Sequence, residues 1–253
     1  MTIRAAVANG VYTIEIARPE KKNALTMEMY TAMTAALKDA EANAAVRAVL
    51  ITGQPGIFTS GNDLDDFMKS PPQDAESPVM QFMKALMACP KPVVAAVTGA
   101  AIGVGTTMLL HCDFVYVSDE ARLALPFVSL GLVPEFGSSY LVPLLLGRAK
   151  AAEKLLLGDP FTGSDAVEAG IANAVLPANE VVNHARRIAE RFNGLPPGAV
   201  AETKRLMVNA RLGQVTQAVQ AENEVFIKRL RSPEAQEAFS AFFQKRRPDF
   251  SKF

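Results

Sequence analysis

The stretch from Pro92 to His111 reads PVVAAVTGAAIGVGTTMLLH and contains no formally charged side chain. Its length approaches that of a membrane-spanning helix. However, the apolar run is interrupted by three glycines and three threonines, which favour a buried strand over 93–97, a glycine turn and a buried helix. A strand followed by a helix, both buried, is typical of a parallel sheet covered on its two faces. We therefore reject the membrane interpretation and predict an α/β protein.

The segments on either side repeat this alternation of strands and helices. Thr26 is placed to cap a helix whose inner face carries Tyr30, Met33, Leu37 and Ala40. Further strands are expected over 11–16, 48–52, 114–117, 121–125 and 171–175, and further helices over 149–157 and 162–169. The Pro- and Gly-rich segment 193–198 breaks the pattern, and the residues beyond it read as helical. We divide the chain into an α/β core, residues 1–195, and a C-terminal helical region, residues 196–253.

Composition excludes several classes of protein. The 253 residues carry 26 basic and 26 acidic side chains, so no net charge favours binding to nucleic acid or to an anionic membrane. Two cysteines, Cys89 and Cys112, are too few for a disulfide framework and are expected to be reduced. The two histidines have no partner at metal-ligand spacing, so a zinc site is not expected.

The ends of the chain carry no recognised address. Residues 1–10 lack the apolar core of a signal peptide. The last three residues, Ser251, Lys252 and Phe253, differ from the peroxisomal Ser-Lys-Leu signal. A cytoplasmic location is the resulting expectation.

Glu135 is the only carboxylate between Arg122 and Arg148, in a segment rich in Leu, Val, Pro and Phe. Burial among such residues disfavours the charged form and raises the pKa of a carboxyl toward the range useful for proton transfer near neutral pH. The alternative is a structural acid beside Pro134 at the start of a helix. Residues around Glu135 do not by themselves decide between the two.

Two glycine-containing loops are candidates for binding a negative oxygen through backbone N–H groups. They are residues 58–64 and residues 99–106, and each leads into an expected helix. The second imitates a dinucleotide-binding motif, but Met108 occupies the third glycine position. Neither a phosphate-binding G-x-x-x-x-G-K-[ST] motif nor a G-x-S-x-G nucleophile motif occurs in the chain. Two converging N–H donors beside a desolvated carboxylate would stabilise an enolate and move its protons.

Three motifs resemble the crotonase (enoyl-CoA hydratase/isomerase) superfamily, and the resemblance covers essentially the whole chain. They are Arg18-Pro19-x-x-Lys22-Asn23-Ala24-Leu25, Ser60-Gly61-Asn62-Asp63-Leu64 and Gly99-x-x-x-Gly103-x-Gly105. A fourth, Pro126-Phe127-x-x-Leu130-Gly131-x-x-Pro134-Glu135-x-x-Ser138-Ser139-Tyr140, narrows it to the peroxisomal type of Δ3,Δ2-enoyl-CoA isomerase. The resemblance implies a spiral of ββα units with C-terminal helices that build a homotrimer or a dimer of trimers.

The resemblance also assigns roles to individual residues. The oxyanion hole would be the backbone N–H groups of Asn62 and Val104, and Glu135 would be the base. The CoA substrate would be bound by Asn23, Ala24, Leu25, Ser60, Gly61, Asn62, Asp63, Leu64 and Gly103. Hydratases of the family have glutamates where this chain has Thr107 and Phe127, so efficient hydration is not expected. The implied reaction shifts the double bond of a 3-enoyl-CoA to the trans-2 position without metal, flavin or nicotinamide.

Several neighbouring residues are expected to be structural. Asp63 is expected to cap a helix, His111 to be a satisfied core or helix-end histidine, and Ser138 and Ser139 to line the turn after Glu135. The run 245–247, Lys-Arg-Arg, is expected either to complement a helix end or to meet CoA phosphates. Phe239, Phe242 and Phe243 are expected to pack on the core or to form a subunit interface.

Three other functions remain open on the sequence. One is a hydratase or another crotonase-type acyl-CoA lyase or hydrolase. A second is a catalytically silent CoA-binding scaffold. The third, a nicotinamide-dependent oxidoreductase, depends only on the imperfect glycine motif.

Overall fold

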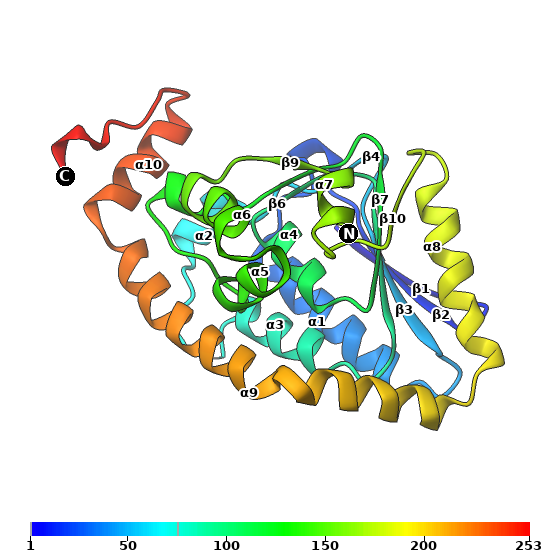
Figure 1. Cartoon of the computed structure of the whole chain (residues 1–253). Helices are drawn as coiled ribbons and strands as arrows, with labels where there is room; N and C mark the ends of the chain where they lie inside the picture. The colour runs from blue at the N-terminus through cyan, green and yellow to red at the C-terminus, as the bar shows by residue number, and fades with distance from the viewer. Residues whose placement is uncertain (1, 75) are drawn as a thin grey trace.

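The computed structural model describes residues 2–74 and 76–253, and its core is a pair of β-sheets (Figure 1). The larger sheet has the strand order β1-β2-β3-β5-β7-β10, and the smaller has the order β4-β6-β8-β9. The larger comprises β1 (Ile3–Ala8), β2 (Val11–Ile16), β3 (Ala48–Thr52), β5 (Val93–Val97), β7 (Phe114–Ser118) and β10 (Ala174–Leu176). The smaller comprises β4 (Gly56–Thr59), β6 (Gly99–Ile102), β8 (Arg122–Ala124) and β9 (Phe161–Thr162).

In each pair of consecutive strands from β3 to β8, the first strand lies in the larger sheet and the second in the smaller sheet. β3, β5 and β7 lie side by side and parallel in the larger sheet, and the strands that follow them, β4, β6 and β8, are parallel neighbours in the smaller one. Helices α2 (Leu64–Lys69), α4 (Val104–Thr107) and α5 (Ser138–Leu146) come after these pairs. The predicted spiral of ββα units is therefore confirmed.

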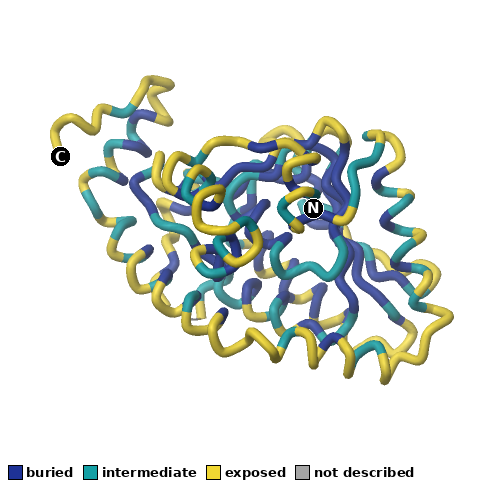
Figure 2. Tube along the Cα trace, in the orientation of Figure 1, coloured by how far each residue is buried: buried dark blue, intermediate teal, exposed yellow. Residues whose placement is uncertain are grey.

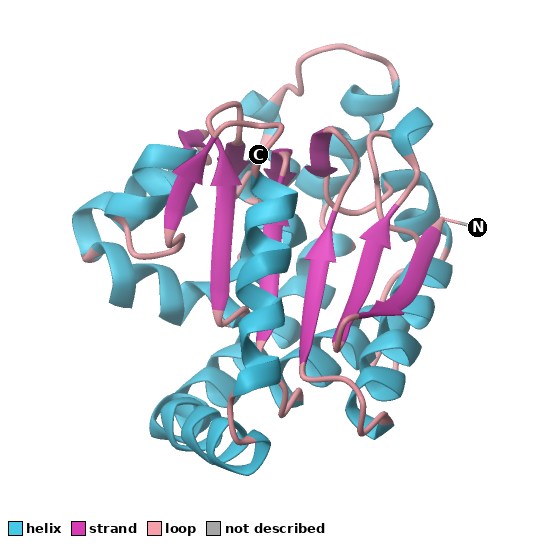
Figure 3. Ribbon diagram, turned by 90° about the vertical axis from the view of Figure 1, so that its right-hand side faces the viewer, coloured by secondary structure: helices cyan, strands magenta, loops and turns pink. Residues whose placement is uncertain are grey.

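The central strands β3 and β5 of the larger sheet are buried at every position because both faces of the sheet are covered there (Figure 3), whereas the edge strand β1 is mostly exposed. On one face, Val49, Ile51 and Ala95 pack with residues of α1 (Met27–Ala42) and α3 (Pro78–Ala88). On the other face, Leu50 and Ala96 pack with α8 (Val181–Glu190). The side chains of a strand alternate between its two faces, so one continuous apolar run supplies both layers.

The segment 92–111 differs from its prediction in one respect. Residues Gly99–Ile102, expected as a turn, form strand β6 of the smaller sheet. A Cβ atom at Gly99 would lie 2.0 Å from the carbonyl oxygen of Gly56, so the glycine allows β4 and β6 to approach each other. The last strand of the larger sheet is also displaced, to Ala174–Leu176 instead of 171–175.

The remaining helices are α6 (Arg148–Ala152), α7 (Gly163–Glu168), α9 (Pro197–Leu230) and α10 (Pro233–Phe243). The long helix α9 runs along one edge of the molecule, and α10 turns back beside the α5–α6 region (Figure 1). Much of α9 is exposed along its length (Figure 2). The division of the chain at residue 195 stays a prediction. None of the helices in the described part of the chain combines the length and apolar content needed to cross a bilayer.

Candidate active site

A cavity of about 700 Å³ opens where the first loops of the chain meet its C-terminal helices. Eight of the residues predicted to bind substrate or form the oxyanion hole line it: Ala24, Ser60, Gly61, Asn62, Asp63, Leu64, Gly103 and Val104. Its remaining walls include Phe127, Leu130, Phe226, Phe242 and Phe243. The cavity therefore combines a backbone-rich polar end with an apolar, aromatic wall.

The backbones at Asn62 and Val104 are brought together by the pairing of β4 with β6. A Cβ atom at Gly61 would lie only 2.8 Å from the carbonyl oxygen of Ile102, so this glycine permits the approach. The N–H of Leu25 donates to the carbonyl oxygen of Gly61, and the carbonyl oxygen of Leu25 accepts from the N–H of Asp63. Asn62 lies between these two bonded residues, so its N–H points away from Leu25. Val104 is the first residue of α4, where helix geometry leaves the N–H without an intrahelical acceptor.

The two later glycines of the motif have separate tasks. Gly103, with φ 57° and ψ −118°, adopts a conformation that residues with a Cβ rarely enter, and it turns the chain from β6 into α4. At Gly105, a Cβ atom would lie 2.6 Å from Cγ2 of Thr59. A glycine is thus needed at the first position for its backbone angles and at the second for close packing.

Asn23 and Leu25 do not present their side chains to the cavity. The Asn23 side chain is fully buried, with 0% exposure, and donates to the carbonyl oxygens of Ile57 and Phe58 while accepting from Arg18 N–H. It therefore fastens the polar turn at 18–23 onto β4. Leu25 is a core residue that supplies the backbone bonds around Asn62. The motif around Asn23 shapes the cavity through the backbone.

Asp63 has the predicted role of a helix cap. Its carboxylate accepts from the N–H groups of Asp65 and Asp66 at the start of α2 and forms a 2.6 Å ion pair with Arg18. Burial alone would raise the pKa of Asp63, but the Arg18 hydrogen bond and the two N–H groups outweigh it and hold the pKa below its usual value. Asp63 is therefore a charged anchor for the loop that carries Asn62.

Glu135, the predicted base, is not among the residues that line the cavity; it is buried, with 5% of the residue exposed. Burial raises its pKa from 4.5 to about 8, against the effect of a hydrogen bond from Thr107 and with a further contribution from the charge of Glu222. Thr107 Oγ1 lies 2.5 Å from Glu135 Oε1. Val104 and Thr107 are the first and last residues of α4, so the residue that bonds to Glu135 lies about one helical turn, roughly 5 Å, along α4 from Val104.

The alternative interpretation of Glu135, as an acid in the first turn of a helix, is wrong. Helix α5 begins at Ser138, and its N-cap is Gly137. The Ser138 hydroxyl donates to the backbone oxygen of Glu135 at 2.6 Å, so it lines the turn as expected. The N–H groups at the start of α5 are bound instead by Glu222 of α9, a residue that sequence reasoning did not single out.

Tyr30 is a second residue that sequence reasoning did not place at the site. Its hydroxyl donates to Asn62 Oδ1 at 2.5 Å, and it is completely buried. Burial, followed by the charge of Glu135, raises the pKa of Tyr30 well above its ordinary value, so the phenol stays protonated. The sequence marked Tyr30 only as a residue on the inner face of a helix, because its partner is 32 residues away.

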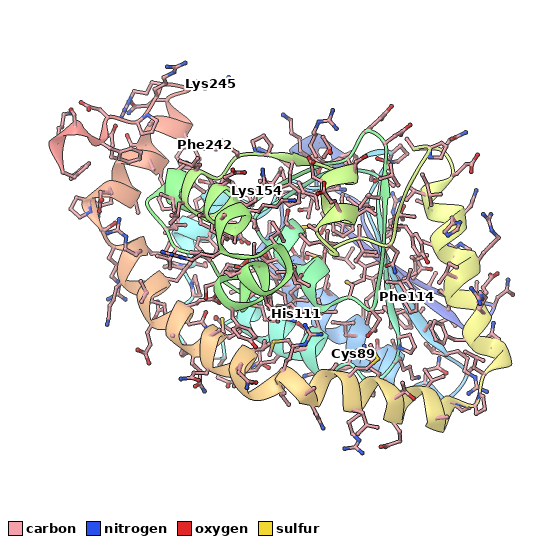
Figure 4. The ribbon with its side chains drawn as sticks, in the orientation of Figure 1. Cys89, His111, Phe114, Lys154, Phe242 and Lys245 are labelled. Carbon is pink, nitrogen blue, oxygen red and sulfur yellow. The ribbon has the colours of Figure 1, made fainter. Side chains whose placement is uncertain are left out.

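His111 is the structural histidine that was expected, and it supports the segment that carries Glu135 (Figure 4). Its Nε2 atom lies 2.7 Å from the carbonyl oxygen of Phe136, and its ring stacks on the Phe136 ring at 4.0 Å between centroids. Burial lowers the pKa of His111 to about 4, so the imidazole is neutral near pH 7 and Nε2 carries the proton that it donates.

The basic run 245–247 is partly engaged within the chain. Arg246 forms a two-pronged contact with Glu237, and this contact holds the pKa of Glu237 at about 2. Lys21 and Lys22, from the polar turn, line the cavity instead, together with the acidic residues Glu20, Asp63 and Asp65. Within the described residues, no group of three His, Cys, Asp or Glu side chains is arranged to hold a metal ion.

A spiral of ββα units that surrounds a cavity of this kind is the architecture of the crotonase enzymes, which act on acyl-CoA thioesters. The chain belongs to the enoyl-CoA hydratase/isomerase family, whose model matches residues 6–252. The resemblance based on the sequence motifs is thereby confirmed.

Two solved structures are closely similar to this chain in fold. The structure of Pseudomonas aeruginosa OdaA is 52% identical, with a TM-score of 0.93 over 95% of this chain and 98% of that one. An enoyl-CoA hydratase/isomerase from Pseudoalteromonas atlantica T6c is 40% identical, with the same TM-score of 0.93 over 99% of this chain and 100% of that one.

Relatives with assigned activities carry different names. The human enoyl-CoA delta isomerase 2 is 34% identical over 87% of this chain and 57% of its own length. The 1,2-epoxyphenylacetyl-CoA isomerase of Escherichia coli K12 is 30% identical over 98% of both chains. A probable enoyl-CoA hydratase of Bacillus subtilis is 28% identical over 98% of both. These names agree on the family and differ on the reaction.

Proposed function

We propose that this protein is a Δ3,Δ2-enoyl-CoA isomerase in which Glu135 is the only catalytic base. The observation that carries the proposal is the carboxylate of Glu135, 5% exposed and with its pKa raised to about 8, which bonds to Thr107 one helical turn along α4 from Val104. A base with a pKa near the working pH both accepts and returns a proton efficiently. Isomerisation needs both steps, and one residue can perform them.

In this mechanism, the thioester carbonyl oxygen lies against the backbone N–H groups of Asn62 and Val104, and the acyl chain passes Val104 toward Glu135. Glu135 removes a proton from C2, and the electron pair moves into a dienolate whose oxygen the two N–H groups stabilise. The protonated Glu135 then returns a proton to C4, which leaves the double bond between C2 and C3. No water, metal or redox cofactor is consumed, and CoA enters only as part of the substrate.

Hydration is the alternative reaction of the family, and the side chains near the cavity argue against it. Thr107 and Phe127 stand where hydratases of the family have glutamates. The hydroxyl of Thr107 donates to Glu135, and the ring of Phe127 forms part of the apolar wall. Neither side chain can act as the second acid–base group that activates a water molecule.

The remaining features of the site suit an acyl-CoA. The ammonium groups of Lys21 and Lys22 at the cavity rim match the phosphates of CoA, and the aromatic wall matches an apolar acyl chain. We further propose that the protein is cytoplasmic and that it forms a homotrimer or a dimer of trimers. Sedimentation of the purified protein would test the oligomeric state.

The decisive experiment follows the rise in conjugated-thioester absorbance when protein is added to a trans-3-enoyl-CoA. Wild type should give a fast rise, and Glu135→Gln should lose roughly 100- to 10,000-fold in kcat, the usual contribution of a general base. Glu120→Gln, which changes an exposed glutamate away from the cavity, is the matched control. No rise with wild type would reject the isomerase, and full activity in Glu135→Gln would reject the base.

A further inference from the structure

The segment 135–139, which carries Glu135 into α5, has an unusual backbone. Phe136 and Gly137 are consecutive residues in the left-handed region, with φ of 59° and 74°. A bulky aromatic residue rarely adopts such a conformation and keeps it only where its surroundings impose it. The direction of the Glu135 side chain therefore depends on whatever holds this turn.

Two hydrogen bonds to the turn come from Glu222, a residue of α9 that lies 85 positions after Gly137. One carboxylate oxygen of Glu222 accepts from Gly137 N–H at 2.6 Å, and the other accepts from Ser139 N–H at 2.7 Å. His111 holds the intervening carbonyl of Phe136 from a third side. The two N–H bonds and the imidazole together leave the turn little freedom.

Capping a helix with Glu222 costs free energy, because a carboxylate has to be buried. The residue is 6% exposed, and none of the ion pairs in the described part of the chain includes it. A serine or aspartate at the N-cap position would satisfy the N–H of Ser139, the second residue of the helix, without burying a distant carboxylate. An anion retained at such a position points to a role beyond stability.

We propose that Glu222 is a positioning residue that holds the 135–139 turn so that the carboxylate of Glu135 is presented to Thr107 and to the acyl chain. This inference rests on the function proposed above, and it makes α9 a part of the catalytic apparatus. The groups that surround Glu135 are then Thr107 on α4, Tyr30 on α1 and Glu222 on α9. His111 acts on the adjacent peptide group.

The test compares Glu222→Gln with Glu224→Gln, a matched control on the exposed side of the same helix. Glutamine has almost the shape of glutamate but places an NH₂ group against one of the two N–H donors, so one bond is lost. We expect kcat to fall roughly 10- to 100-fold, as for a support of a catalytic group, with KM changed less than about twofold. Glu224→Gln should leave both parameters unchanged.

The pH profile separates positioning from mere stabilisation. The negative charge of Glu222 adds to the rise in the pKa of Glu135, so removing that charge favours the Glu135 carboxylate. The acidic limb of kcat/KM should therefore move to lower pH in Glu222→Gln. A lower melting temperature with unchanged kcat and an unmoved acidic limb would show a purely structural residue and overturn the inference.

Two further measurements keep the test decisive. If Glu222→Gln does not fold, Glu222→Asp takes its place, because aspartate keeps the negative charge but has a shorter side chain. Glu222→Asp should lower kcat without shifting the acidic limb of kcat/KM. An unchanged kcat would overturn the inference. If wild type does not isomerise the substrate, the ¹³C NMR titration of the Glu135 carboxyl, identified by its loss in Glu135→Gln, replaces kinetics. A shift of that titration to lower pH in Glu222→Gln supports the inference even then, and an unshifted titration rejects it.

Discussion

At the scale of single residues, the raised pKa that suits Glu135 to its proposed role as a base also lowers the stability of the folded protein. Its pKa in the folded protein is about 8, against 4.5 for an ordinary glutamate. The folded state therefore keeps a proton that the unfolded state has already lost, and stability falls as the pH rises from about 4.5 to about 8. The cost is about 1.4 kcal/mol for each unit of pKa difference.

Glu135→Gln, which cannot ionise, should therefore be more stable than wild type in alkaline solution. We expect the advantage to be absent near pH 4.5, to grow to a few kcal/mol by about pH 8 and then to level off. Thermal or urea denaturation of both proteins across this range measures it. Identical stability curves would mean that Glu135 ionises normally in the folded protein.

Thr107 acts on the same carboxyl in the opposite direction to Glu222. Its hydroxyl bonds to Oε1 and lowers the pKa of Glu135. Thr107→Val keeps the shape of the side chain but removes the donor, so the acidic limb of kcat/KM should move to higher pH. A hydrogen bond to a charged group contributes about 1.5–3 kcal/mol, so kcat/KM near pH 7 should fall roughly 10- to 100-fold.

Thr107→Ser is the matched variant, because it retains the hydroxyl and loses only a methyl group. The acidic limb of kcat/KM should lie at the same pH in Thr107→Ser as in wild type. A Thr107→Val limb that moves to lower pH, or does not move, would contradict the assigned hydrogen bond.

At the scale of elements, the short helix α4 depends on the glycine before it. Gly103 has φ 57° and ψ −118°, and it turns the chain into α4, whose first residue, Val104, lines the cavity. Gly103→Ala should cost about 1–3 kcal/mol of stability because an alanine is strained there. It should also lower kcat, because the oxyanion donor is turned away.

Gly213→Ala provides the contrast, since Gly213 lies inside helix α9 with open space where a Cβ would go. It should raise stability by about 0.5–1 kcal/mol without changing kcat. Chemical denaturation and the absorbance assay of the two variants measure both effects. A Gly103→Ala protein as stable and as active as wild type would show that the turn is less demanding than its backbone angles indicate.

At the scale of the whole molecule, the cavity is assembled from segments that span nearly the entire sequence. The polar turn near residue 22, the loop around Asn62 and helix α4 line the cavity together with Phe242, labelled in Figure 4, and Phe243 of α10. Helix α10 is held by its buried residue Phe239, whereas Phe242 is 58% exposed. Phe242 thus belongs to the cavity wall more than to the core.

Phe242→Ser should therefore change substrate binding more than folding. We expect KM for a long-chain acyl-CoA to rise several-fold, with kcat within about twofold and the free energy of unfolding within about 0.5 kcal/mol of wild type. Phe253→Ser, at a phenylalanine that is 57% exposed and outside the cavity, is the control. Equal KM values for the two variants would remove α10 from the substrate site.

Local patterns in the sequence account for much of this protein. Apolar runs with strand period predicted β2, β3, β5 and β7, and Thr26 and Asp63 marked the helices that they cap. The apolar sequence around Glu135 predicted a desolvated acid, and burial is the main cause of its raised pKa. In each case the physical cause lies within a few residues along the chain.

Contacts between distant segments were decided only by the tertiary structure. The bonds from Tyr30 to Asn62, from Thr107 to Glu135 and from Glu222 to Gly137 span 32, 28 and 85 residues. The same is true of strand β6 and of Asn23, which pack against β4. The sequence by itself therefore determined that Glu135 is a buried acid and where strands β2, β3, β5 and β7 run. What surrounds that acid was decided by the fold, because hydrogen bonds depend on distance in space and not on spacing along the chain.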